Sequence, residues 1–444
     1  MNGVPMMIFQ LMLSLSFLVI IHECGHFFPA KWFKTRVEKF YLFFDPWFSL
    51  FKTKKGETEY GIGWLPLGGY VKISGMVDES FDTEKLKEEP KPWEFRSKPA
   101  WQRLIIMLGG VTVNFIAGFL LFAFILGKWG EEYVPASSVK EGIYVDSLGK
   151  ELGLREGDII LKVGGKDFIN FDERTIKREI IINGANTIVV KRDGQIVNVQ
   201  IPEEATHLLS AQKNKAAGLI SPRAGIIVKD FVENSPGKAA GIQLNDRILS
   251  IDGNNTLYSK DYLALPKDFK LGDTVTVKIS RNLTEQEFRF ATNADKKMGL
   301  QLGSDIKIER KHYGFFEAIP AGVNKGLGFL GDQIKAFGRM FKGKVKASES
   351  LGGFASITSL FPKTWDWEDF IRITAILSLI LGFMNLLPIP GLDGGHVIFL
   401  LFEMVTGRKL SDKFVEKATM VGFGLLIALM LYANGLDVFR YFKK

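Results

Sequence analysis

Two histidines and a glutamate stand close together at the end of an uncharged apolar segment near the N-terminus. His22, Glu23 and His26 form the pattern His-Glu-x-x-His within the stretch IIHECGHFF. On a helix, positions four apart share a face, so both imidazoles can bind one metal ion. Glu23 lies about 100° around the helix from His22, where it can take a proton from an attacking water. The pattern predicts a catalytic metal site.

A catalytic zinc site uses three protein ligands and keeps one position open. The expected third ligand is Asp393, which lies in the stretch MNLLPIPGLDGGH after another apolar segment. Pro388 and Pro390 should end the preceding helix there, and the glycines should let the backbone turn tightly. His396 is a rival ligand, which we interpret as a neighbour of the site because Asp393 directly follows the break.

Two further side chains, Cys24 and Glu403, are alternative ligands. Cys24 follows His22 by two positions and points about 200° away on a helix, so we expect it to pack. A different metalloprotease class would take a downstream glutamate as its third ligand. Glu403 is the candidate near the site, but it lies ten residues past Asp393 without the expected spacing.

Four stretches are apolar enough to be considered as membrane spans. They are residues 4–21, 104–126, 373–389 and 418–436. A span needs about 20 residues, so the second and fourth qualify outright, and the other two qualify if their polar ends enter the membrane. The chain has 46% apolar and 24% charged residues, which fits a membrane protein with a sizeable aqueous part. Its net charge of +8 is spread along the chain and fits basic membrane flanks, and no nucleic-acid motif is present.

The distribution of lysine and arginine predicts the orientation of these spans. Residues 31–103 and the short link between spans three and four are rich in both, which makes these two loops cytoplasmic. The N-terminus and the long segment 128–368 are then outside. Spans one and three run in the same direction, so Asp393 should lie at the depth of His22 and His26.

The outer segment contains a repeat. GLREGDIILKVGGKDF (153–168) and GIQLNDRILSIDGNNT (241–256) align at a constant offset of 88 residues, and residues 186–194 and 273–280 read as strands of the same two units. The repeat resembles the bacterial PDZ pattern, which implies a groove that takes a peptide by strand addition. Spacer domains with an inert groove are the alternative. Residues 309–368 then include an amphipathic segment, either on the membrane surface or packed under the repeats.

The two site motifs together resemble a known family. His-Glu-x-x-His near the end of a first span, with Asn-x-x-Pro-x-Pro-x-Leu-Asp-Gly at the end of a later one, is similar to the site-2 protease family of intramembrane zinc metalloproteases. Tandem PDZ domains between spans two and three point to the bacterial branch that regulates the sigma-E response. The resemblance covers essentially the whole chain and includes WLPLGGYVKISG, FRSKPAWQRLIIMLGG and SLGG.

The resemblance implies roles for particular residues. One Zn²⁺ per chain would be bound by His22, His26 and Asp393, and Glu23 would be the catalytic base. Asn385 would hold the substrate backbone through its side-chain amide. The stretch YGIGWLPLGGYVKISGM (60–76) would form a hairpin that re-enters the membrane and pairs with an extended substrate. The expected substrate-binding residues are Asn385, Pro388, Pro390, Gly69, Tyr70, Val71 and Lys72.

The implied activity is cleavage of single-pass membrane segments after another protease has trimmed their outer domain. Substrates would be an anti-sigma factor and leftover signal peptides, and the PDZ domains would act as a size filter. The protein would lie in the bacterial inner membrane, with its active site toward the cytoplasm and its PDZ domains in the periplasm. The alternative function is a non-enzymatic PDZ scaffold with a structural metal, which would not need Glu23.

The expected fold is a multi-domain membrane protein with a four-span helical core, a membrane-associated β-hairpin and two tandem β-rich PDZ domains. The expected boundaries are 1–30 for the first span, 31–100 for the cytoplasmic loop with the hairpin, 101–127 for the second span, 128–220 and 221–308 for the PDZ domains, 309–368 for the amphipathic segment, 369–395 for the third span, and 396–444 for the cytoplasmic link, fourth span and tail.

Overall fold

The computed structural model of the chain forms two compact units. It describes residues 3–76, 89–211, 214, 218–265, 273–292, 298–346, 348 and 351–442. The first unit spans Met1–Gly130, His312–Ile334 and Leu351–Lys444, and the second spans Glu131–Lys311 and Lys335–Ser350. The candidate site residues all belong to the first unit, so each unit is described by itself.

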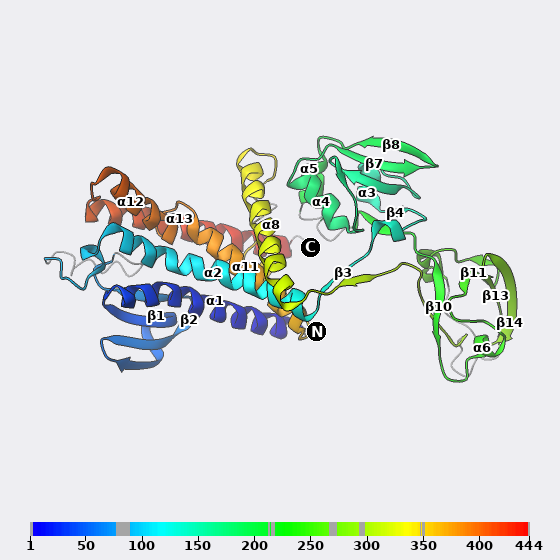
Figure 1. The fold of residues 1–444 in the computed structure, drawn as a ribbon, viewed down its shortest axis with the longest axis horizontal. Coiled ribbons are helices and arrows are strands. Elements are labelled where there is room, and N and C mark those ends of the chain that lie inside the picture. Colours follow the sequence, from blue (N-terminus) through cyan, green and yellow to red (C-terminus); the bar gives the residue numbers. More distant parts are fainter. Residues whose placement is uncertain are drawn as a thin grey trace. The chain divides into compact units, whose positions relative to one another are not determined.

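Four helices of the first unit are long and apolar enough to cross a membrane. They are α1 (Val4–Trp32), α2 (Ala100–Lys128), α11 (Trp367–Leu386) and α13 (Asp412–Phe442). Each contains most of one of the apolar stretches found in the sequence, so the prediction of four membrane-capable segments is confirmed. The helices run alongside one another as a bundle (Figure 1).

Helix α2 lies against both α1 and α11, and small residues allow its close approach. A methyl group added at Gly25 of α1 would come within 2.7 Å of the Gly110 Cα atom of α2. Gly118, further along α2, lies directly against Leu379 of α11. Helices in membranes associate through this kind of tight contact between small residues. Helix α2 therefore touches α1, which carries His22 and His26, and α11, which leads into the break before Asp393.

The chain breaks after α11 and starts a further helix. Leu387, just before Pro388, is extended at φ −60° and ψ 145°, and Gly391 has a φ of +98°. Helix α12 (Asp393–Thr406) follows and ends at Gly407, which has a φ of +69°. The sequence predicts the end of span three and a cytoplasmic link here, but the stretch forms a helix of its own. Its 14 residues are too few to read as a span.

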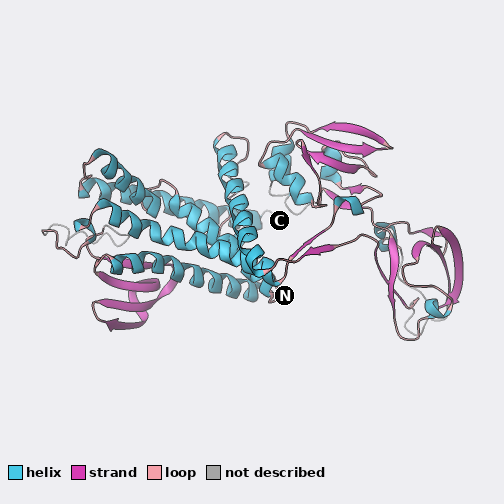
Figure 2. Ribbon diagram, in the orientation of Figure 1, coloured by secondary structure: helices cyan, strands magenta, loops and turns pink. Residues whose placement is uncertain are grey.

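The hairpin beside α1 is larger than expected. Strands β1 (Val37–Lys55) and β2 (Thr58–Ile73) are antiparallel, whereas the sequence indicated only residues 60–76. Phe40 of β1 pairs with Val71 on one side and with Tyr60 on the other. The hairpin is therefore folded back on itself, with residues 65–73 along one edge. Figure 2 shows its strands next to one end of the helix bundle.

The hairpin is joined to the bundle by a shared apolar core. Val37 and Ile73, which pair with each other, are buried with Ala30 of α1 and with Ile106 and Met107 of α2. The turn region far from this core exposes large apolar side chains, namely Trp47, Phe48, Leu50 and Phe51. Exposed apolar side chains of this kind suit contact with lipid or a partner.

The second unit contains two β-rich repeats. The first has a sheet in the order β6-β5-β7-β8 and the pair β4-β9, and the second has a sheet in the order β14-β13-β11-β10-β15, with β12 paired to β11. Their bounds are β4 (Ile143–Val145), β5 (Ile159–Val163), β6 (Lys166–Asp167), β7 (Thr187–Arg192), β8 (Gln195–Gln200), β9 (Ile220–Pro222), β10 (Ile226–Phe231), β11 (Arg247–Ile251), β12 (Asn254–Asn255), β13 (Thr274–Arg281), β14 (Thr284–Ala291) and β15 (Leu300–Ser304). The strands predicted at 186–194 and 273–280 are β7 and β13, so both predictions are confirmed.

Each of the two repeats contains an equivalent ion pair around a buried aspartate. Asp158 accepts two hydrogen bonds from Arg192, each 2.7 Å long, and Arg192 also donates to the carbonyl of Gly153. Asp246 and Arg281 make the same contacts in the second repeat. Asp158 and Asp246 are 88 residues apart, which is the offset of the sequence repeat. The repeat in sequence is therefore also a repeat in structure.

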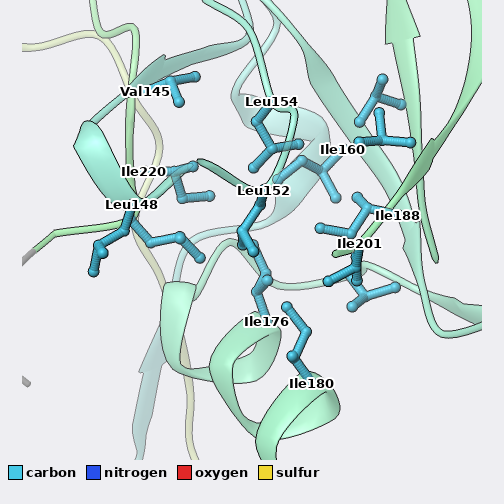
Figure 3. Packing of buried hydrophobic residues seen from close by; sticks show 14 of the residues in the cluster. Val145, Leu148, Leu152, Leu154, Ile160, Ile176, Ile180, Ile188, Ile201 and Ile220 are labelled. Atoms are coloured by element: carbon cyan, nitrogen blue, oxygen red, sulfur yellow. The ribbon is translucent and has the colours of Figure 1, made fainter. Parts of the chain in front are cut away.

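Short helices complete these repeats. They are α3 (Ser147–Glu151), α4 (Glu173–Ile181) and α5 (Ala205–Ser210) in the first, and α6 (Pro236–Ala239) and α7 (Ser259–Leu263) in the second. Figure 3 shows Ile176 and Ile180 of α4 pointing toward Leu152 and the strand residues Ile160 and Ile188. Strands β3 (Glu131–Tyr133) and β16 (Glu309–Lys311) pair antiparallel, so the chain enters and leaves the repeats side by side.

Helix α8 (Phe315–Phe341) is amphipathic, and the short helix α10 (Phe354–Thr358) follows it along the chain. The part of α8 up to Ile334 belongs to the first unit and crosses the bundle in Figure 1. Its buried positions are small: Gly322 lies against Ala123 of α2, and Gly326 against Phe119. Phe315 and Phe316 at its start are exposed. This fits the expected amphipathic segment, and its place on a membrane surface stays a prediction.

Candidate metal centre

Three predicted ligands meet at one point inside the first unit. The Nε2 atoms of His22 and His26 lie 3.2 Å apart. Oδ2 of Asp393 lies 3.4 Å from the first of these nitrogens and 3.3 Å from the second. All three side chains are at most 15% exposed. Among the described residues, this is the one group of histidine, cysteine and acidic side chains with the geometry of a metal site.

The three donor atoms fit zinc. Zinc–nitrogen and zinc–oxygen bonds of roughly 2.0–2.2 Å in a tetrahedral site hold the donor atoms about 3.3 Å apart. The observed separations of 3.2 to 3.4 Å match this spacing. Oδ2 of Asp393 is also a buried acceptor that has no hydrogen-bond partner among the described residues. An unsatisfied buried carboxylate oxygen beside two imidazole nitrogens is what a cation would stabilise.

Two helix features bring the donors together. His22 and His26 are four residues apart within α1, so their side chains lie on one face. Asp393 is the first residue of α12, directly after the break that follows α11. Glycine is required behind it, because a methyl group on Gly394 would collide with the backbone of Leu386. The turn can therefore bring the Asp393 carboxylate to the histidines only if the next position, Gly394, has no side chain.

Helix α2 holds both imidazole rings. Nδ1 of His26 lies 2.9 Å from the carbonyl oxygen of Ile106, and Nδ1 of His22 lies 2.9 Å from the side-chain amide of Asn114. These contacts turn the Nε2 atoms toward Asp393. Gly110 lies between the two contacts, and a methyl group there would meet His26 Nε2 and come within 2.7 Å of His22 Cε1. Any side chain at Gly110 would occupy the space beside the donor atoms.

Glu23 lies beside the donors without joining them. Its side chain is 9% exposed, and it does not belong to the group of three donors. The backbone N–H of Val71 on β2 donates to its carboxylate. Gly69 on the same strand is close enough that a methyl group would lie 3.5 Å from Glu23 Cγ. The carboxylate is therefore placed between the donors and the edge of the hairpin.

The predicted substrate-binding residues come from two segments of the first unit. The side-chain nitrogen of Asn385, near the end of α11, is 3.4 Å from His22 Nε2. Pro388 is exposed and Pro390 partly exposed in the break before α12. Gly69, Tyr70, Val71 and Lys72 lie on β2, in the part that forms an edge of the hairpin.

The rival ligands are not among the three donors. The His396 ring contacts Phe399 one turn along α12, and it is outside the group of donors. Glu403 is paired with Arg103 at the start of α2. Cys24 is partly exposed and is also outside the group. The geometry therefore does not favour a downstream glutamate as third ligand.

Some residues around the site were missed or undervalued from the sequence. Gly110 is not among the predicted site residues, yet it faces both imidazoles. Asn114 is not among them either, although it contacts His22. A lone amide within an uncharged span is itself a signal, because buried polar groups in membranes are expensive and need partners. The partly buried pair of Arg103 and Glu403 has no such signal, because its members are 300 residues apart.

A two-histidine, one-aspartate centre with a buried glutamate beside it, in a unit with four membrane-capable helices, is typical of a membrane metalloprotease. The model of peptidase family M50 matches residues 10–429. The chain belongs to this family, and the resemblance to site-2 proteases is thereby confirmed.

Relatives of full length support the same conclusion. The chain is 30% identical to a putative zinc metalloprotease of Borreliella burgdorferi, with 96% of each chain covered. It is 28% identical to a putative zinc metalloprotease of Thermotoga maritima, with 98% of this chain and 99% of the relative covered. It is 27% identical to the regulator of sigma-E protease RseP of Escherichia coli, with 97% of each chain covered.

Proposed function

We propose that the protein is a zinc metalloendopeptidase that hydrolyses peptide bonds within the membrane-spanning segments of single-pass proteins. The observation that carries this proposal is the meeting of three donor atoms, 3.2 to 3.4 Å apart, beside a buried carboxylate. His22, Glu23 and His26 lie on α1, which can cross a membrane, and Asp393 follows the break at the end of α11, which can cross one too. A non-enzymatic scaffold with a structural metal would have no use for Glu23, so this alternative is not favoured.

Each residue of the centre has a distinct task in the proposed reaction. His22, His26 and Asp393 would hold one zinc ion, which, when bound, lowers the pKa of water and polarises a carbonyl group. Glu23 would take the proton of the attacking water and pass it to the leaving amine. Its burial between the donors and β2 holds it where both partners can reach it.

The hairpin edge and Asn385 would hold the substrate. A helical segment hides its carbonyl groups in its own hydrogen bonds, and unwinding it in lipid costs several kcal/mol for each unpaired group. The edge formed by residues 69–73 is paired with β1 on one side, and the described part of the chain places no strand on its other side. Its Val71 N–H already faces Glu23. An extended substrate paired to this edge would run past the catalytic base, with Asn385 opposite.

We further propose a setting and a substrate class. The protein would lie in the bacterial inner membrane with the metal centre toward the cytoplasm and the β-rich repeats in the periplasm. Its substrates would be an anti-sigma factor that another protease has already trimmed, and leftover signal peptides. The names of the relatives support this proposal, because one of them is the regulator of sigma-E protease RseP.

The two β-rich repeats would be PDZ domains that exclude untrimmed substrates by size. Because β3 and β16 pair side by side, residues 134–308 can be replaced by a short linker with both strands kept. We expect this deletion to leave zinc binding unchanged, since no donor lies in the second unit. The wild-type protein should cleave trimmed substrate faster than untrimmed substrate, and the deletion should make the two rates equal.

The measurement is cleavage of one single-pass substrate with and without its outer domain, by both proteins in detergent micelles. A wild-type protein that cleaves neither form would contradict the proposed function. A deletion variant that still discriminates as well as the wild type would leave the function standing and reduce the repeats to spacers.

A further inference from the structure

Asn114 of α2 contacts a predicted zinc ligand from a fully buried position. Its side-chain amide lies 2.9 Å from Nδ1 of His22, and the residue has no exposed surface. The other terminal atom of the amide has no hydrogen-bond partner among the described residues. The contact with His22 is therefore the one that decides which way this amide faces.

The chemistry of a zinc-bound histidine fixes what the partner must be. A neutral imidazole that binds through Nε2 carries its hydrogen on Nδ1, so Nδ1 must donate. The two ends of an asparagine amide have the same shape, and the hydrogen-bond network decides which is the oxygen. Only the amide oxygen can accept the His22 N–H. This orients the Asn114 oxygen toward His22.

His26 shows the same arrangement, and its partner is a group that can only accept a hydrogen bond. Nδ1 of His26 lies 2.9 Å from the backbone carbonyl oxygen of Ile106, which can only accept. Ile106 and Asn114 are both on α2, on either side of Gly110, which faces the two rings. One helix thus offers one acceptor to each ligand imidazole.

We propose that Asn114 is a positioning residue, whose side-chain oxygen accepts the Nδ1–H of His22 and fixes the tautomer and ring orientation that present Nε2 to zinc. The proposal rests on the proposed function and extends it to a residue that would never touch the metal or the substrate. Partners of this kind increase ligand basicity, and their loss typically weakens metal binding by about 10–100-fold.

The position of Asn114 in the helix packing supports this role. Its backbone carbonyl accepts a 2.7 Å hydrogen bond from the hydroxyl of Ser378 on α11. Gly382, one turn further along α11, is close enough that a methyl group would lie 3.4 Å from Asn114 Cβ. The side chain is thus enclosed between α1 and α11 and cannot turn away from His22 into solvent.

The test compares two substitutions of similar size. Asn114→Asp keeps an oxygen acceptor, and Asn114→Leu removes it. Ser378→Ala is the matched control, because it removes a buried hydrogen bond to Asn114 without touching His22. The zinc dissociation constant is measured by chelator competition in detergent, and the visible spectrum of the cobalt-substituted protein reports ligand geometry.

We expect Asn114→Leu to raise the dissociation constant by about 10–100-fold and to alter the cobalt spectrum, while Asn114→Asp and Ser378→Ala stay close to the wild type. Equal loss of zinc in the Asp and Leu variants would overturn the proposal, because it would show that the amide does not act as an acceptor. If Asn114→Leu fails to fold, Asn114→Asp decides alone. A wild-type protein without zinc affinity would instead overturn the proposed function together with this extension.

Discussion

Replacing Glu23 by glutamine is expected to leave zinc bound and to slow cleavage by about 10²–10⁴-fold, which is the usual contribution of a general base. Glutamine has nearly the same shape and can still accept the Val71 N–H, so the surroundings of the side chain should persist. It cannot take a proton from water. Since Glu23 lies outside the group of three donors, the metal should not depend on it.

The measurement combines metal analysis and a cleavage assay on the same purified sample. Cys24→Ser is the matched control, because Cys24 is adjacent in sequence but lies outside the donor group. It should keep both zinc and activity. A Glu23→Gln protein that loses its zinc would make Glu23 a ligand and would contradict its assignment as the base.

Asp393→Ala is expected to remove most of the bound zinc. Its carboxylate supplies one of the three donors and is the only one of them that carries a negative charge at neutral pH. Without it, two imidazoles 3.2 Å apart remain, with no third ligand near them among the described residues. Cleavage should be lost together with the metal.

His396→Ala provides the comparison for Asp393→Ala. Both residues are on α12, one turn apart, and His396 contacts Phe399 rather than the donors. Zinc content measured on both variants at the same protein concentration decides the assignment. If His396→Ala lost more zinc than Asp393→Ala, the third ligand would be wrongly assigned.

The donors could be predicted because their spacing follows from simple rules. Two histidines four residues apart share a face of any helix, so His22 and His26 needed no tertiary information. Asp393 required one further step: two spans that run in the same direction end on the same side of a membrane. The proline and glycine break before it then indicated where the helix stops, and α11 does end at Leu386.

The surroundings of the donors could not be predicted because they depend on contacts between distant segments. Asn114 and Gly110 face the imidazoles only because α2 packs closely on α1 at Gly25. The ion pair of Arg103 and Glu403 joins α2 to α12 across 300 residues. The pattern of one sequence does not show which distant residues are in contact.

Two local elements were also missed for identifiable reasons. The first strand of the hairpin, Val37–Lys55, mixes aromatic and basic residues, and its charges were read as a cytoplasmic loop. Helix α12 is short, and the sequence pattern predicts its start at Asp393 to be the end of the preceding span. Packing against the bundle decides the structure of the strand, and the break decides where α12 starts. Local propensity matters less in both cases.

The central claim is best tested by locating the bond that the protein cuts. A purified single-pass segment without its outer domain is incubated with the detergent-solubilised protein, and the products are identified by mass spectrometry. We expect a cut within the apolar segment that disappears when a chelator removes zinc and returns when zinc is restored. A cut confined to the residues outside the apolar segment, or cleavage that persists without metal, would contradict the account.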